Sequence, residues 1–190
     1  MNDSLALIEL DSVASGLAAL DAMVKQAPIE VLEANLVEPG KFLILYTGGV
    51  AEVGESHQRV MGEFKEHVRS EMLLPMVHGE LVEGLRGVEH RDVTDALGVV
   101  EGTDVAGTLL SADGALKGAD VALVGIRVAI GLGGRAYFLV SGAQHDVQAS
   151  IDAAAGVLEP LGRLHRIELI ARPHDEMVVW LLRPAPFRVG

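Results

Sequence analysis

The sequence predicts an α/β fold of the α+β type, with two tandem domains that each combine an antiparallel sheet with helices. Two observations predict this fold class. A shift of 92 residues (101 minus 9) places Glu101 on Glu9 and lays one half of the chain on the other, which indicates an internal repeat. Within each half, apolar runs of strand length alternate with segments whose apolar residues recur at helical spacing.

Matched residues carry the repeat on both sides of a glycine-marked loop. The loop is "VEPGK" in the first half and "IGLGG" in the second. After the loop the shift becomes 94 (134 minus 40), so the second loop is two residues longer. The matched pairs are Glu9 and Glu101, Asp21 and Asp113, Lys25 and Lys117, Gly40 and Gly134, Lys41 and Arg135, and Gly48 and Gly142.

The first half begins with a strand and a helix. The apolar run "LALIEL" from Leu5 has strand length, and Ser12 is a suitable N-cap for the helix that follows. Pro28 ends this helix, since proline is not accommodated in a helix interior. The apolar stripe of the helix consists of Val13, Leu17, Leu20 and Val24.

Two antiparallel strands come next, at residues 29–37 and 41–49, and the glycine-marked loop joins them. We then expect a helix over residues 50–68, a strand over 71–77 and a short helix over 78–87. The order strand, helix, strand, strand, helix, strand is that of a ferredoxin-like domain.

The second half repeats this order. Its last elements are expected as a helix at 146–162, a strand at 163–171 and a helix at 174–182. We place the two domains at residues 4–86 and 95–183, with the polar stretch 87–95 as the linker.

Composition excludes several classes of function. The net charge of −12 argues against nucleic acid and anionic membranes as partners, because both need a basic face. The longest apolar segment, from Val121, is interrupted by Arg127 and rich in glycine, so we expect no membrane span. The acidic N-terminus is unlike a secretory signal and predicts a cytoplasmic protein. With no cysteine, disulfides, thiolate metal sites and a cysteine nucleophile are excluded.

Five segments together resemble the tandem-domain shell proteins of bacterial microcompartments, most closely the single-layer trimers of the propanediol-utilization shell. They are "LALIELDSVASGLAALDAMVKQAP", "PGKFLILYTGGVAEV", "ALGVVEGTDVAGTLLSADGALKGADVAL", "RVAIGLGGRAYFLVSG" and "IARPHDEM". The resemblance implies that three chains form a pseudohexameric trimer, a tile that paves the facets of a protein shell together with hexameric and pentameric shell proteins. It implies a structural, pore-bearing function without catalysis, within the microcompartment shell.

The resemblance also implies residues of the tile edge. Lys25 and Lys117, each near the end of a helix, match the family's edge lysine, and Arg172 matches its edge arginine. Met76 occupies the arginine's position in the first half. The alternative for each lysine is an ordinary side chain that complements the helix dipole.

The two loops match the segments that surround the family's central pore. They contain Glu38, Pro39 and Gly40 in the first half, and Gly131, Leu132, Gly133 and Gly134 in the second. In an iron-sulfur branch of the family a cysteine stands where this chain has Glu38, so a cluster is not supported and no cofactor is expected.

Three copies of Glu38 around a three-fold axis would favour cations and polar neutral molecules over anions. Alternatively, Glu38 turns aside to Lys41 or to solvent. For the second loop, a plain hairpin turn and a place in the pore wall both stay open.

We find no catalytic motif and no metal-ligand set, because none of the seven histidines is paired at metal-binding spacing. Two other functions fit the pattern. One is a small-molecule sensor made of tandem ferredoxin-like domains, which would need no self-tiling surface. The other is a metal or redox carrier at the pore that uses carboxylates in place of thiols.

Overall fold

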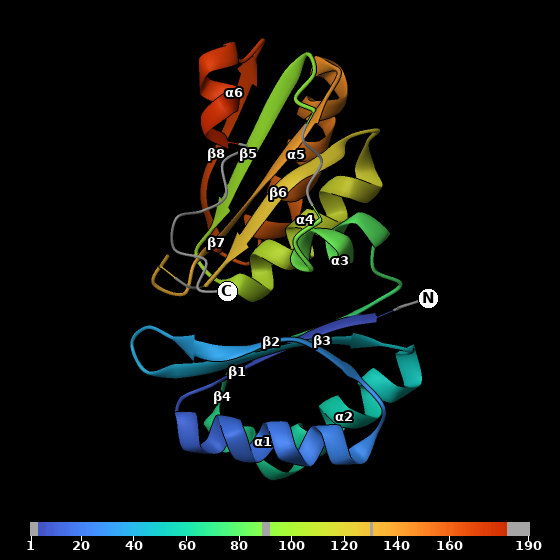
Figure 1. Cartoon of the computed structure of the whole chain (residues 1–190), viewed down its shortest axis with the longest axis vertical. Helices are drawn as coiled ribbons and strands as arrows, with labels where there is room; N and C mark the ends of the chain where they lie inside the picture. The colour runs from blue at the N-terminus through green and yellow to red at the C-terminus, as the bar shows by residue number, and fades with distance from the viewer. Residues whose placement is uncertain (1–3, 89–91, 130, 182–190) are drawn as a thin grey trace.

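The computed structural model describes residues 4–88, 92–129 and 131–181 and contains two similar domains, one above the other in Figure 1. The order of elements in the first domain is the ferredoxin-like order that the sequence predicts. These elements are β1 (Ser4–Leu10), α1 (Val13–Gln26), β2 (Glu30–Val37), β3 (Lys41–Gly48), α2 (Val50–Glu63) and β4 (Val68–Pro75), and α3 (Gly79–Leu85) follows them.

The second domain repeats the first. Its elements are β5 (Ala96–Gly102), α4 (Val105–Gly118), β6 (Ala122–Val128), β7 (Ala136–Gly142), α5 (Gln144–Leu158), β8 (Leu164–Ala171) and α6 (Asp175–Leu181). The antiparallel sheets have the equivalent orders β2-β3-β1-β4 and β6-β7-β5-β8. Even the register irregularities match, since the one between Val31 and Glu33 recurs between Leu123 and Gly125. The predicted duplication and fold class are confirmed.

Local chemistry sets the limits of the elements. Ser12 caps α1 by accepting a hydrogen bond of 3.1 Å from the Ser15 amide, and α1 ends just before Pro28. The helix expected over residues 50–68 is shorter than predicted: α2 ends at Glu63, and a 3₁₀ turn covers Lys65–His67. The reason is β4, which starts at Val68 because that residue pairs with the end of β1. Residue 182 and residues 89–91 of the expected linker lie outside the described part of the chain. Within the described residues, no helix is long and apolar enough to cross a membrane.

The first sheet is apolar on both faces. On one face, Ile8 and Ile44 pack against α1 and α2. On the other face, Leu5, Leu7 and Leu45 belong to the same buried cluster as residues of the second domain. Burial of both faces explains why β1 and β3 are continuous apolar runs instead of alternating ones. The two domains therefore share a core.

A polar chain inside the first domain breaks the internal symmetry. Tyr46 Oη lies 2.9 Å from His57 Nδ1, and His57 Nε2 lies 2.6 Å from Glu71 Oε2. The equivalent residues of the second domain are all aliphatic: Val140, Ile151 and Ile167. Burial, and then the negative charge of Glu71, raise the pKa of the Tyr46 phenol far above its ordinary value.

Tyr46→Phe should make the free energy of unfolding fall less steeply as pH rises above about 10. Above about pH 10 the unfolded chain releases the phenol proton while the folded chain keeps it, so the free energy of unfolding falls as pH rises. We expect the variant to be less stable by about 1 kcal/mol at pH 8, through its lost hydrogen bond, but to have a shallower slope above pH 10.

Urea denaturation between pH 8 and pH 11 measures both effects. The matched control is Tyr137→Phe, which changes the one other tyrosine of the chain. Equal slopes in the wild type and in Tyr46→Phe would contradict the assignment.

Candidate functional site

The first loop forms the exposed tip of the β2–β3 hairpin. Glu38, Pro39 and Gly40 are exposed, and Gly40 has a φ of 95°, a conformation that favours glycine. Lys41 Nζ donates to Glu9 Oε2 at 2.7 Å, and Glu9 is buried. Among the described residues Glu38 forms no ion pair, so its carboxylate is not the partner of Lys41 and faces solvent in the single chain.

The second loop is a tight turn between β6 and β7. Gly131, Gly133 and Gly134 have φ values of 73°, 62° and 80°. Glycine adopts such values without steric cost, which explains why this turn contains three glycines. Leu132 is half-buried, and its amide donates to the Ala129 carbonyl at 3.1 Å. Residue 130 lies outside the described residues.

The two loops touch each other. A Cβ placed on Gly134 would lie 3.5 Å from Val37 Cγ1 and 3.7 Å from the Glu38 carbonyl oxygen. Both hairpin tips lie on the left side of the molecule in Figure 1. The second loop is therefore a hairpin turn that also stands beside the first loop.

Near the second loop, a group of three polar side chains takes the place of the Lys41–Glu9 ion pair of the first domain. Arg135 Nη1 lies 3.2 Å from His165 Nε2, and that nitrogen lies 3.8 Å from Glu101 Oε2. Arg135 and Glu101 are the equivalents of Lys41 and Glu9, but here a histidine stands between them and the side chains are partly exposed.

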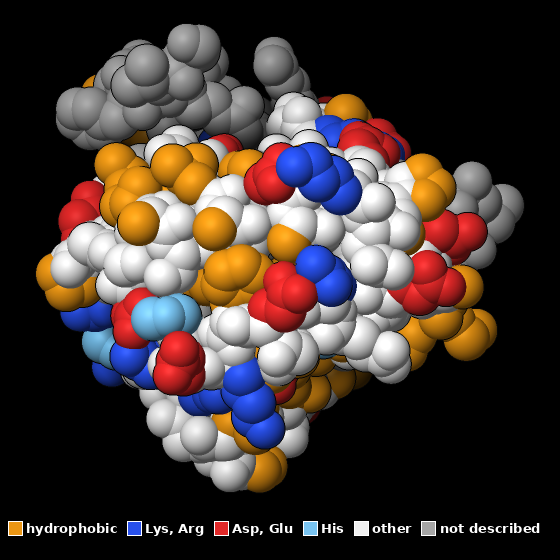
Figure 2. Space-filling view, turned by 90° about the horizontal axis from the view of Figure 1, so that it is seen from below, with side chains coloured by type: hydrophobic (Ala, Val, Ile, Leu, Met, Phe, Trp, Pro, Cys, Tyr) orange, Lys and Arg blue, Asp and Glu red, His pale blue; other side chains and the backbone are white. Residues whose placement is uncertain are grey.

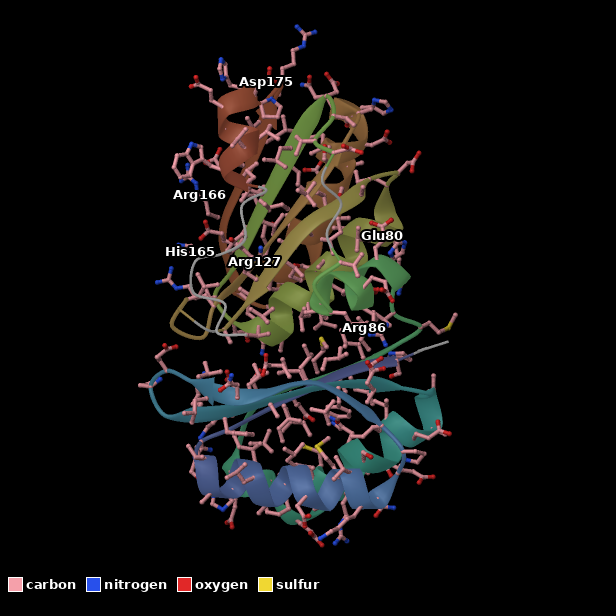
Figure 3. All side chains as sticks on the ribbon, viewed as in Figure 1. Glu80, Arg86, Arg127, His165, Arg166 and Asp175 are labelled. Atoms are coloured by element: carbon pink, nitrogen blue, oxygen red, sulfur yellow. The ribbon has the colours of Figure 1, made fainter. Side chains whose placement is uncertain are left out.

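The junction between the domains is polar at one end. The His78 amide donates to Asp113 Oδ1 at 2.7 Å, and Lys117 Nζ donates to Asp113 Oδ2 at 2.6 Å and to the Met76 carbonyl at 2.7 Å. The Leu123 amide donates to Glu80 Oε2 at 2.9 Å, and Figure 3 places Glu80 where α3 meets the second domain. These bonds fix α3 and the preceding loop on α4 and β6.

Among the described residues, the surfaces of α1 and α6 that are equivalent to the two sides of the domain junction, here called the half-surfaces, are more exposed than the junction itself. Leu17 of α1 is 54% exposed, whereas its equivalent in α4, Leu109, is fully buried. Val24 is 46% exposed and its equivalent Leu116 only 4%. Figure 2 faces the α1–α2 side, where apolar side chains lie among acidic and basic ones.

The other half-surface is on α6. Among the described residues α6 buries none, whereas its equivalent α3 buries Leu81, Val82 and Gly84. Figure 3 places Asp175, the first residue of α6, at the end of the molecule far from the first domain. The chain thus contains one complete interface between its domains, and α1 and α6 expose surfaces equivalent to the two sides of that interface.

The residues expected at the tile edge belong to these surfaces. Lys117 lies at the complete interface and Lys25, paired with Asp21 at 2.6 Å, at the equivalent place on α1. Met76 and Arg172 both have left-handed backbone, with φ values of 55° and 50°, so they occupy the same structural position. Lys117 contacts Met76, but Lys25 belongs to α1 of the first domain and Arg172 follows β8 of the second.

Sequence analysis did not find the junction residues His78, Glu80 and Leu123. One signal for the junction was available, since the match of Asp21 with Asp113 marks equivalent positions in the two halves. Within the described residues, no group of three or more His, Cys, Asp or Glu could hold a metal ion.

The structure defines a class of protein in which one ferredoxin-like domain occurs twice in a single chain. The family model "BMC domain" matches residues 4–77 and 96–173, so the chain belongs to the BMC domain family, as the resemblance indicated.

Among known proteins, the chain is 32% identical over 177 residues to the bacterial microcompartment shell protein PduT of Citrobacter freundii, covering 93% of this chain and 96% of that one. A solved microcompartment protein from Desulfitobacterium hafniense DCB is 32% identical, with a TM-score of 0.87 over 93% of this chain and 98% of that chain. A fused permuted hexameric shell protein from the RMM microcompartment, 21% identical, shares the fold with a TM-score of 0.62 over 84% of this chain and 85% of that one.

Asp113→Ala should lower the free energy of unfolding of the dilute chain by about 1 to 3 kcal/mol, because it leaves the His78 amide without its acceptor at the domain junction. The matched control is Asp21→Ala, since Asp21 is exposed and, within the described part of the chain, forms an ion pair with Lys25 alone. For this variant we expect a change below about 1 kcal/mol. Chemical denaturation at low protein concentration measures both, and equal losses would contradict a special role for the junction.

Proposed function

We propose that this protein is a structural shell protein of a bacterial microcompartment, and that three copies close head to tail into a pseudohexameric trimer. The observation that carries the proposal is the pair of half-surfaces, on α1 and on α6, that correspond to the two sides of the domain junction. A relative at 32% identity is a microcompartment shell protein, which supports the same function here.

The domain junction is a template for the contact between copies. The equivalent of the His78–Asp113 bond joins the His174 amide of one copy to Asp21 of the next. The equivalent of the Lys117–Met76 bond joins Lys25 to the Arg172 carbonyl. Head-to-tail contacts of this kind generate a closed ring when the rotation closes, and a ring of six domains needs three two-domain chains.

The hairpin loops surround the centre of this trimer. Since the two loops touch within one chain, the first and second loops alternate around the three-fold axis. Glu38 then brings three exposed carboxylates to the opening, where they favour cations and small polar molecules over anions. The cysteine-free sequence supplies no thiolate for an iron-sulfur cluster at this place, so the proposed pore contains no cofactor.

Lys25, Lys117 and Arg172 are proposed as edge residues through which tiles meet one another and other shell proteins. Lys117 keeps 43% of its side chain exposed while it holds the junction, so it is available at the rim. A flexible ammonium with three donors can bond carbonyl groups on both sides of such an edge.

Mass measurement tests the trimer. The wild type should have about three times the chain mass of 20.1 kDa, and Leu17→Asp should be a folded monomer because it places a charge in the buried seam. Leu161→Asp is the control, since Leu161 is 48% exposed but lies in the turn before β8, outside both half-surfaces. A wild-type monomer at every concentration, or a discrete dimer, would refute the proposal.

Glu38→Gln should reduce the preference of the pore for cations over anions, because it removes three charges from the opening. The measurement is the ratio of cation to anion permeability through assembled layers. Glu55→Gln, which removes an exposed carboxylate from α2, serves as the control with the same change of net charge. An unchanged ratio in Glu38→Gln would show that Glu38 does not line the opening.

A further inference from the structure

We propose that Trp180 anchors the contact between copies by packing on Val31 and Ala34 of the next copy, and that an exchange of large and small side chains distinguishes this contact from the junction within the chain. The inference rests on the proposed trimer. It adds a specificity-determining residue to it.

Within the chain, a glycine lets α3 lie directly on β6. A Cβ on Gly84 would stand 2.6 Å from Leu123 Cδ2 and 3.5 Å from Ile126 Cγ2. Contacts under 3.0 Å are essentially never found for real Cβ atoms, so a side chain here would force the buried Leu123 side chain to move. Leu123 and Ile126 are buried.

The equivalent position in α6 holds the largest side chain. The shift of 96 that places Arg172 on Met76 (172 minus 76) also places Trp180 on Gly84. On the opposite side, the shift of 92 places Leu123 on Val31 and Ile126 on Ala34. The matching irregularities of β2 and β6 confirm that these strand positions correspond.

The differences on the two sides offset each other in volume, because the larger side chain at one position faces smaller side chains at the two others. Where the junction has glycine against leucine and isoleucine, the contact between copies has tryptophan against valine and alanine. Protein interiors fill space closely and tolerate changes that conserve volume far better than added or missing groups. With these differences, α6 of one copy can pack closely on β2 of the next copy. The side chains in that contact are not the ones that join α3 to β6 within a chain.

Exposure supports the same assignment. Trp180 is 68% exposed in the single chain, and Val31 and Ala34 are only half-buried, whereas Leu123 and Ile126 are buried. A large aromatic side chain that fills a recess at the centre of a contact is typical of residues that dominate binding energy. Val179 beside it, 54% exposed, extends the apolar surface.

The exchange also excludes a wrong contact. If α6 of one copy took the place of α3 on β6, its indole would have to enter a space where even a methyl group requires the Leu123 side chain to move. The size difference therefore opposes a contact between α6 of one copy and β6 of another. This is specificity by steric exclusion as well as by attraction.

Tryptophan fluorescence tests directly whether the Trp180 indole is buried in the trimer, because Trp180 is the one tryptophan of the chain. In trimers of confirmed mass we expect emission shifted to shorter wavelength and acrylamide quenching several-fold weaker than in the Leu17→Asp monomer. A trimer with solvent-exposed emission would overturn the inference and leave the trimer intact. Emission already shifted in the monomer would mean that the indole is covered within one copy, and would also overturn it.

A size-swap series tests specificity. Trp180→Gly should raise the concentration at which trimers dissociate at least tenfold, and so should the pair Val31→Leu and Ala34→Ile, which copies the surface of β6. The triple variant recreates the pairing of the junction and should recover most of the loss. Mass measurement follows each variant, and circular dichroism verifies the fold. A triple variant no better than Trp180→Gly would overturn the inference, whereas a wild type that never forms trimers would refute the proposed function itself.

Discussion

The first sheet's need to bury both of its faces is the constraint on which the rest of the structure depends. Its helices cover one face, and the leucines of the other face are buried only because α4 and its surroundings pack there. Exposed, such a face would be a large apolar patch of the kind that drives association. A two-domain chain meets this need once, within itself, and leaves the corresponding surfaces of α1 and α6 at opposite ends.

The two domains differ in two places. One is the set of surfaces related to the domain junction, and the other is the core of the first domain. Gly84 and Trp180 differ in size at equivalent positions, and Met76 and Arg172 differ in chemistry although their backbones are alike. The chain of Tyr46, His57 and Glu71 is a different case, because it lies between a sheet and its own helices and has purely aliphatic equivalents. Divergence therefore affects both the surfaces and one of the cores, while the sheets keep the same register.

The duplicated pattern made the fold predictable, since every element in one half could be verified against the other. The error at α2 arose because an amphipathic pattern continues past Glu63, and only the pairing of Val68 with Leu10 ends the helix. Composition of the loops indicated turns, but their mutual contact through Gly134 depends on how the domains dock.

One partner of Lys117 was not predictable for a related reason. Asp113 lies four residues earlier in α4, a spacing that favours an ion pair, but the Met76 carbonyl belongs to the first domain, and no local signal in the sequence relates it to Lys117. The predictions for Glu38 and for the edge residues came from resemblance, and the single chain leaves them as proposals.

The joining of two domains in one chain affects how readily the proposed trimer assembles. A ring of six separate domains requires six molecules to meet, and its yield falls steeply on dilution. In the proposed trimer, every second contact is already made when the polypeptide folds, at the high effective concentration of a covalent link. Only the three contacts between chains remain to be formed, so such rings would form at protein levels too low for six separate domains, and the order of first and second domains around them would be set during synthesis.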